Sequence, residues 1–165
     1  MGNAVSGTLD AVCIAATAGA PMSSRSGVEA IVGRGLLGDR YESGIGTFSG
    51  RFEVTAGARH VSIIDAMAIA ECNARLVANL GACDLRRNLV IRGLDLDALH
   101  GAVIAIGDVR LRLTGGCPPC GYLSRLLGVD ARLGLRHIGG ARASIIEGGW
   151  LTVGALVHVL ASQGR

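Results

Sequence analysis

Two cysteines separated by two prolines, Cys117 and Cys120, are the residues of this sequence best suited to chemistry. They follow a segment with the alternating pattern of a strand, and residues 121–127 have the pattern of a short helix. Cys120 would then lie near a helix start, where backbone N–H groups and the helix dipole favour the reactive thiolate. The two prolines stiffen the approach and hold both sulfur atoms in place.

Three kinds of site are compatible with this pair. A zinc site needs two further ligands, but the sequence has no second Cys-x-x-Cys motif and its four histidines are widely scattered. A redox pair of the thioredoxin type belongs in a strand–helix–strand context near the N-terminus, whereas this pair comes late in a strand-rich chain. The third kind is a single soft metal ligand at Cys120, with Cys117 as a bystander or helper. The motif alone leaves these alternatives open.

Two arginine-containing segments could bind an anion. In the first, Arg86, Arg87 and Asn88 lead into a predicted strand over residues 88–91. Because side chains alternate along a strand, Arg86 and Asn88 are expected on one face and Arg87 on the other. A guanidinium and an amide on one face make an anion clamp, since arginine binds phosphate through a planar fork. The alternative is a solvated strand edge.

The second segment runs from Gly38 to Tyr41, in a glycine-rich stretch, and carries Arg40. It lacks the Gly-Lys-Ser/Thr ending of a P-loop, so the sequence does not support binding of a nucleoside triphosphate. A glycine-rich loop with an arginine can still present N–H groups and positive charge to an anion. A tight turn held by a pair between Asp39 and Arg40 would explain the segment equally well.

Strands dominate the rest of the pattern. The expected strands cover residues 12–16, 29–32, 60–64, 88–91, 103–106, 109–114, 144–147, 150–153 and 156–160. Gly148 and Gly149 predict a two-residue hairpin between two of these strands. One good helix is expected to begin after an N-cap at Asp65 and to stop at Gly81. The pattern is that of a mainly β protein with short helices, and it predicts a compact, mostly antiparallel β-barrel.

Two other cysteines are predicted to be structural thiols. Cys72 lies on the apolar side of the expected helix, and Cys13 lies within the first apolar strand. Five cysteines make an odd number, which argues against a secreted disulfide framework. The apolar stretch over residues 11–20 is too short to span a bilayer, and no positively charged region precedes it. We therefore expect a cytoplasmic protein that neither crosses nor binds a membrane.

The composition restricts the function further. A chain of 165 residues, half of them hydrophobic, suits one domain over residues 1–165. All sixteen basic side chains are arginines, so the chain cannot form a lysine Schiff base with pyridoxal phosphate. The net charge of +3 and the few aromatic residues argue against a nucleic-acid partner. That charge does suit a local anion pocket.

In their order along the chain, these motifs resemble the MOSC family, which is named for the C-terminal domain of molybdenum cofactor sulfurase. The resemblance covers about residues 20–159. Its motifs are Pro21-Met-Ser23, Gly35-Leu-Leu-Gly-Asp-Arg-Tyr41, Gly44-Ile-Gly-Thr47, Val61-Ser-Ile-Ile64, Arg86-Arg-Asn-Leu-Val-Ile-Arg-Gly-Leu-Asp-Leu96, Ile106-Gly-Asp108, Cys117-Pro-Pro-Cys120 and the strand pair over 149–154. The chain departs from the family pattern at Ala155, where an aspartate is usual, and in the helix start at Asp65.

The resemblance implies a barrel of the MOSC type, similar to the β-barrel of pyruvate kinase, and a molybdenum cofactor (molybdopterin) as the ligand. The family's molybdenum-ligating cysteine matches Cys120. The positions that hold the pterin and its phosphate match Arg86, Asn88 and Arg40. Such a cofactor needs a clamp for its phosphate and one thiolate to complete the coordination of the metal.

Three functions are compatible with this resemblance. The first is a reductase of N-hydroxylated compounds that takes electrons from an electron-transfer partner protein, with Cys120 as the molybdenum ligand. The second is a non-catalytic module that holds the cofactor, or that carries sulfur as a persulfide on Cys120 after loading by a cofactor or sulfur donor. Cys117 could resolve such a persulfide by forming a disulfide. The third is a barrel without cofactor whose thiols are structural.

Overall fold

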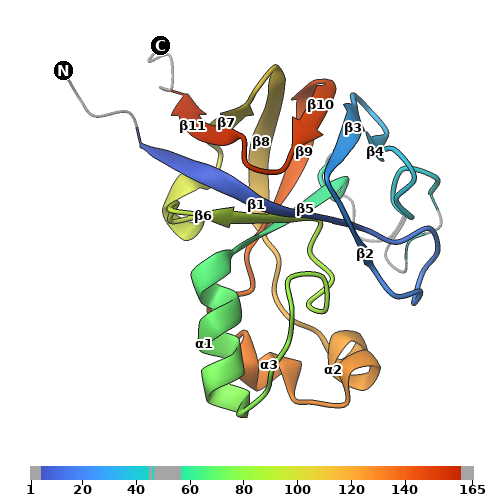
Figure 1. Cartoon of the computed structure of the whole chain (residues 1–165), viewed down its shortest axis with the longest axis vertical. Helices are drawn as coiled ribbons and strands as arrows, with labels where there is room; N and C mark the ends of the chain where they lie inside the picture. Colours follow the sequence, from blue (N-terminus) through green and yellow to red (C-terminus); the bar gives the residue numbers. More distant parts are fainter. Residues whose placement is uncertain (1–4, 45, 47–56, 161–165) are drawn as a thin grey trace.

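Seven strands form a closed barrel in the computed structural model, which describes residues 5–44, 46 and 57–160 (Figure 1). The order around the barrel is β11-β7-β8-β9-β5-β6-β1, and β1 pairs with β11 to close it. Neighbouring strands are antiparallel, except that β5 and β6 are parallel. The barrel strands are β1 (Ser6–Ile14), β5 (Val61–Asp65), β6 (Leu89–Arg92), β7 (Val103–Ile106), β8 (Val109–Gly116), β9 (Ala141–Glu147) and β11 (Leu156–Leu160). The predicted mostly antiparallel barrel is confirmed.

The other elements cover the barrel on two sides. β2 (Ser23–Arg25) pairs with β1, and a second sheet has the order β10-β3-β4, with β10 (Gly149–Thr152), β3 (Gly27–Ile31) and β4 (Gly35–Leu36). The helices α1 (Ala66–Leu76), α2 (Gly121–Leu127) and α3 (Ala131–Gly134) gather at one end of the molecule (Figure 1), and a 3-10 turn covers Asp97–Leu99. None of the helices described is long and apolar enough to cross a membrane.

The period-two pattern of the strands fills the barrel with apolar side chains. In β8, Val109, Leu111 and Leu113 are buried, whereas Arg112 between them is exposed. A second apolar layer lies between the barrel and the helices and includes Cys72, which is fully buried as predicted. The helical end of the molecule therefore has an apolar core of its own, which supports the loops that connect strands to helices.

Helix α1 begins as predicted and ends earlier than predicted. The side chain of Asp65 accepts a hydrogen bond of 2.8 Å from the backbone N–H of Met67, as an N-cap does. The helix ends at Leu76, and Val77 follows in the left-handed conformation, with φ of 49°. The cause is the side chain of Asn73, which bonds both the N–H and the C=O of Leu80 and turns the chain back.

The predicted hairpin at Gly148 and Gly149 is wrong. β9 pairs with β8 and β5 in the barrel, whereas β10 pairs with β3 in the second sheet. The two glycines carry the chain from one sheet to the other. A Cβ on Gly148 would lie 2.7 Å from the carbonyl oxygen of Ala30, so the glycine is required by a close backbone approach.

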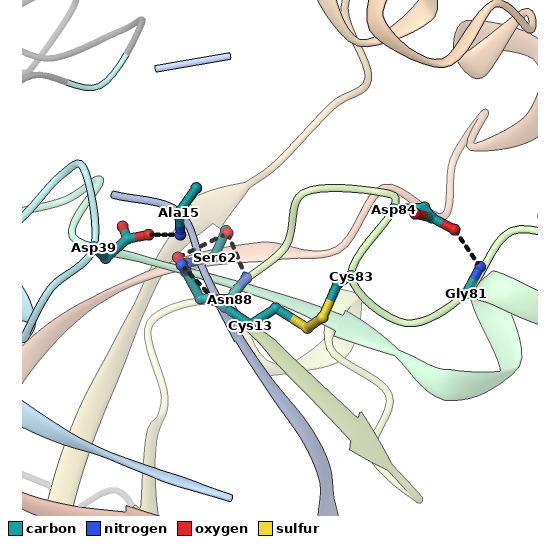
Figure 2. Close-up of a disulfide and its surroundings, with 8 residues drawn as sticks. All are labelled: Cys13, Ala15, Asp39, Ser62, Gly81, Cys83, Asp84 and Asn88. Carbon is teal, nitrogen blue, oxygen red and sulfur yellow. Dashed lines mark hydrogen bonds between the residues drawn. A yellow bond between two sulfur atoms is a disulfide. The ribbon is translucent and has the colours of Figure 1, made fainter. Parts of the chain in front are cut away.

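The prediction of a free structural thiol at Cys13 is also wrong, because Cys13 forms a disulfide with Cys83 (Figure 2). The two residues are 70 positions apart, and their Cα atoms are 5.5 Å apart. Cys83 lies in the loop between α1 and β6, within a turn in which the side chain of Asp84 accepts a hydrogen bond of 2.7 Å from the N–H of Gly81. The disulfide therefore fastens this loop to β1. Cys72, Cys117 and Cys120 are free.

Candidate functional site

A cavity of about 210 Å³ brings together the Cys-Pro-Pro-Cys loop and the predicted anion-binding arginines. It has five arginines and both of these cysteines in its wall, and no carboxylate among the lining residues that the structure describes. Its lining residues are Arg40, Tyr41, Arg59, Ser62, Arg86, Arg87, Cys117, Pro118, Pro119, Cys120, Tyr122, Leu123 and Arg142. A strongly cationic pocket with two thiols suits an anionic ligand that also has a soft, sulfur-binding centre.

The two cysteines of the motif are placed by the elements on either side of them. Cys117 follows the end of β8, and its N–H donates a hydrogen bond of 2.9 Å to the carbonyl oxygen of Gly140. Cys120 directly precedes α2, as predicted, and its own carbonyl oxygen accepts a hydrogen bond from the N–H of Ser124. Both cysteines are partly exposed and line the cavity, so either sulfur can contact a ligand there.

Arg87 holds this loop in place, a role that the sequence pattern did not indicate. Its buried guanidinium donates to three carbonyl oxygens: 2.9 Å to Gly139, 3.2 Å to Leu85 and 2.8 Å to Cys117. It therefore ties the loop before β6 to the loop that carries the cysteines. The sequence indicated only a side chain on the opposite face from Arg86, because hydrogen bonds to distant carbonyl groups leave no spacing pattern.

Arg86 lines the cavity, but not for the reason that the sequence suggested. Its φ of 60° is left-handed and β6 starts only at Leu89, so the expected alternation along a strand is wrong here. One guanidinium nitrogen, Nη1, donates to the carbonyl oxygen of Ala20. The other, Nη2, is buried and has no hydrogen-bond partner among the residues described. Burial lowers the pKa of Arg86, and the neighbouring Arg40 cation lowers it further.

Asn88 lies beside the cavity rather than in its wall. Its Nδ2 donates 3.1 Å to the carbonyl oxygen of Cys13, and its Oδ1 accepts from both the N–H and the hydroxyl of Ser62 (Figure 2). The side chain is buried, and these bonds join β1 to β5. Ser62 itself lines the cavity. In this arrangement Asn88 contacts the site through Ser62, and direct contact with a ligand stays a prediction.

Arg40 lines the cavity, and the alternative considered for its segment, a turn with a pair between Asp39 and Arg40, is present. Its Nη1 lies 3.1 Å from the buried Oδ1 of Asp39, and its guanidinium carbon lies 4.7 Å from the centre of the Tyr41 ring. Oδ1 of Asp39 also accepts a hydrogen bond of 3.1 Å from the N–H of Ala15 (Figure 2). The aspartate fixes the arginine to the residue that follows β1 and neutralises part of its charge.

Sequence reasoning missed three other polar residues of the cavity, namely Arg59, Tyr122 and Arg142. Arg142 is on β9, where its Cα is paired with that of Ser62 in β5. Arg59 comes just before β5, and Tyr122 belongs to α2. Nothing in their local sequence distinguishes these residues from a solvated arginine or a helix tyrosine, because only the barrel brings β9 beside β5.

The free cysteines are expected to differ in reactivity. Burial raises the pKa of the Cys72 thiol, and the nearby Arg75 cation lowers it by less, so little thiolate forms at neutral pH. Brief treatment of the native protein with iodoacetamide should label Cys117 and Cys120 but leave Cys72 unlabelled, as read by mass spectrometry of peptides. Unfolding without reductant should add Cys72, and reduction should then add Cys13 and Cys83. Labelling of Cys72 as fast as Cys120 would contradict this assignment.

The residues present fit a molybdopterin-type cofactor. The buried Nη2 of Arg86 offers an unused donor to an anionic oxygen, and partly exposed thiols lie in the same cavity. In the described part of the chain, no three His, Cys, Asp or Glu side chains are grouped to hold a metal ion. A metal in this cavity would therefore need ligands beyond those that the described residues provide, and the two sulfur atoms of a molybdopterin dithiolene are of that kind.

Comparisons with known proteins found a matching family model and solved structures with a similar fold. A family model described as the MOSC domain matches residues 34–158. The solved structure of the YuaD protein from Bacillus subtilis is 18% identical, with a TM-score of 0.79, and the match covers 99% of this chain and 100% of that one. The structure of YiiM from Escherichia coli is 13% identical, with a TM-score of 0.69, and the match covers 96% of this chain and 72% of that one. At these identities the structures show a shared fold. None of the curated proteins matches this sequence.

Proposed function

This chain belongs to the MOSC domain family, and from that premise we propose that it binds a molybdenum cofactor and reduces N-hydroxylated compounds. One observation carries the proposal: the buried Nη2 of Arg86 has no partner among the described residues, and Arg86 lines a cavity whose wall also contains Cys120. A buried cationic donor without an acceptor is costly, and a phosphate oxygen would satisfy it.

Each group of the cavity has a separate task in this proposal. Arg86 and Arg40 bind the phosphate of the cofactor, and Asn88 acts through Ser62, which lies in the cavity wall. Cys120 provides the thiolate ligand to molybdenum. Arg87 keeps the cysteine loop at a fixed position, because it bonds the carbonyl group of Cys117.

The overall reaction takes two electrons and two protons. The N–O bond of the N-hydroxyl group breaks, an N–H bond forms, and the oxygen leaves as water. When bound, the cofactor supplies the two-electron redox centre for this chemistry. The electrons come from an electron-transfer partner protein. The partly enclosed cavity restricts the access of bulk water to the reacting groups.

A second function is favoured by the position of Cys117. Both cysteines of the motif line the same cavity and are free and partly exposed. A persulfide on Cys120 could pass its outer sulfur to an acceptor thiolate, or Cys117 could attack the inner sulfur, form a disulfide and release hydrosulfide. In that case the protein is a sulfur carrier, and a sulfur donor protein loads it.

Molybdenum content tests the proposal. The full chain purified from a host that makes the cofactor should contain about one molybdenum per chain, measured by elemental mass spectrometry. Cys120→Ser should lose most of the metal, because a hydroxyl is a poor replacement for a soft thiolate ligand. Cys117→Ser is the matched control and should keep its metal. With a chemical electron donor, the metal-containing protein should convert an N-hydroxylated base to the free base.

Other results would change the conclusion in defined ways. A wild-type protein without molybdenum, isolated from that host, would overturn cofactor binding. Metal without any reduction of the N-hydroxylated base would overturn the reductase and leave a cofactor-holding module. A mass increase of 32 Da that is lost on reduction and absent in Cys120→Ser would identify the persulfide carrier; 32 Da is about the mass of one sulfur atom.

A further inference from the structure

The cavity contains more positive charge than one phosphate group needs. Arg40 is paired with Asp39, and Arg87 is bound to three carbonyl groups. Arg86 offers its buried Nη2. Arg142 is a partly buried residue and differs from all of these, because its guanidinium forms no hydrogen bond or ion pair with any residue that the structure describes.

Arg142 and Arg86 approach the cavity from different sides. Arg142 lies on β9, with its Cα paired to that of Ser62 on β5, and Arg86 precedes β6 on the other side of β5. Neighbouring strands are about 4.8 Å apart, so β9 and β6, which lie on either side of β5, are separated by roughly 10 Å. An anion held by Arg142 can therefore occupy a position separate from that of a phosphate on Arg86.

We propose that Arg142 binds a carboxylate or phosphate group of the substrate, so that the preferred substrates are anionic N-hydroxylated compounds. This inference rests on the proposed function. A guanidinium binds either group through two parallel N–H···O bonds. Because the side chain is partly buried and no carboxylate lines the described cavity wall, the arginine keeps its full charge for a ligand. A nucleotide-bearing form of the cofactor would present the same chemistry through an additional phosphate.

Paired substrates test the proposal on the metal-containing protein. N-hydroxybenzamidine is neutral, and its 4-carboxylate carries one negative charge at neutral pH. Arg142→Gln should raise KM for the carboxylate about 10- to 100-fold, the loss expected for a hydrogen-bonded charge pair. KM for the neutral compound and kcat for both compounds should stay within about twofold, because the lost contact stabilises the ground state and the transition state equally. Arg142→Lys should restore part of the affinity.

The controls separate this role from a structural one. Arg112→Gln removes an exposed arginine of β8 outside the cavity wall and should change neither KM. Molybdenum content and any nucleotide released on acid treatment should be equal in Arg142→Gln and the wild type. Loss of nucleotide or molybdenum in the variant would overturn the proposal that Arg142 binds the substrate. It would show instead that Arg142 binds an anionic group of the cofactor. An equal rise in KM for both substrates would also overturn it.

A second measurement does not depend on the proposed function. The metal-free full chain is titrated with inorganic phosphate by calorimetry. We expect two sites, of which Arg142→Gln removes one and Arg86→Gln the other. A single phosphate site that is weakened by both variants would overturn a separate subsite at Arg142. If the protein never contains molybdenum but binds phosphate at two sites, the anion subsite at Arg142 is supported and the proposed function is overturned.

Discussion

Replacing Cys13 and Cys83 together by alanine is expected to lower the free energy of unfolding by about 4 kcal/mol. The disulfide closes a loop between residues 70 positions apart, so its loss frees a long stretch of the unfolded chain. Denaturation in urea, followed by circular dichroism, measures the effect. Reductant should destabilise the wild-type protein by a similar amount and leave the double variant unchanged.

The same substitution is expected to weaken the anion site. The carbonyl oxygen of Cys83 accepts a hydrogen bond of 3.2 Å from the N–H of Arg86, so the disulfide holds the backbone that carries this arginine. Phosphate affinity, or molybdenum content, should fall along with the stability. Cys117→Ala is the control, because it removes a partly exposed cysteine without a disulfide and should leave stability almost unchanged. A wild-type protein whose stability is insensitive to reductant would contradict the role of the disulfide.

Replacing Arg87 by methionine is expected to cost roughly 3–5 kcal/mol of stability, the range for breaking one side of a buried, hydrogen-bonded charge. Methionine keeps the apolar stem but leaves the carbonyl groups of Gly139, Leu85 and Cys117 without their donor. The Cys-Pro-Pro-Cys loop should then move more freely. Iodoacetamide should therefore label Cys117 and Cys120 faster in the variant, and molybdenum content should fall.

Arg110→Met is the matched control for this variant. Arg110 also donates to two carbonyl oxygens, those of Gly107 and Val109, but on the outside of the barrel where water can replace it. It should change stability by less than about 0.5 kcal/mol. If Arg87→Met does not fold, Arg87→Lys is used in its place. A single ammonium can replace only part of the three hydrogen bonds, so this variant should show a smaller effect of the same kind. A Lys variant with unchanged stability, metal content and labelling would contradict the positioning role.

The sequence predicted best the elements that a local pattern controls. β7 and α2 have the bounds expected from apolar spacing and flanking glycines, and β11 also has its expected bounds. The end of α1 could not be predicted, because it depends on the side chain of Asn73 reaching Leu80. The pairing of β10 with β3, in the second sheet, depends on which strand lies nearby in the folded protein, and two adjacent glycines resemble a hairpin turn.

The sequence named residues that the structure brings together, but it did not predict their geometry, and their binding roles stay predictions. Cys120, Arg86 and Arg40 do meet in one cavity. Asn88 was expected beside Arg86 on one strand face, but the left-handed φ of Arg86 breaks that relation. The alternation of side chains along a strand assumes an extended backbone at every position. The sequence does not indicate that an arginine will adopt a φ of 60°. The disulfide between Cys13 and Cys83 could not be predicted either, since the spacing of cysteines in a sequence does not determine which of them form disulfides.

The pairing of β1 with β11 has a consequence for synthesis of the protein in the cell. Residues 6–8 pair with residues 156–158, so the barrel cannot close until translation has passed residue 158. At typical elongation rates, about 8–30 s pass between the synthesis of β1 and the synthesis of β11. During that time one edge of a largely apolar strand is open to pairing with another chain. Folding yield should therefore depend on translation speed and on chaperones that shield the nascent N-terminal strand.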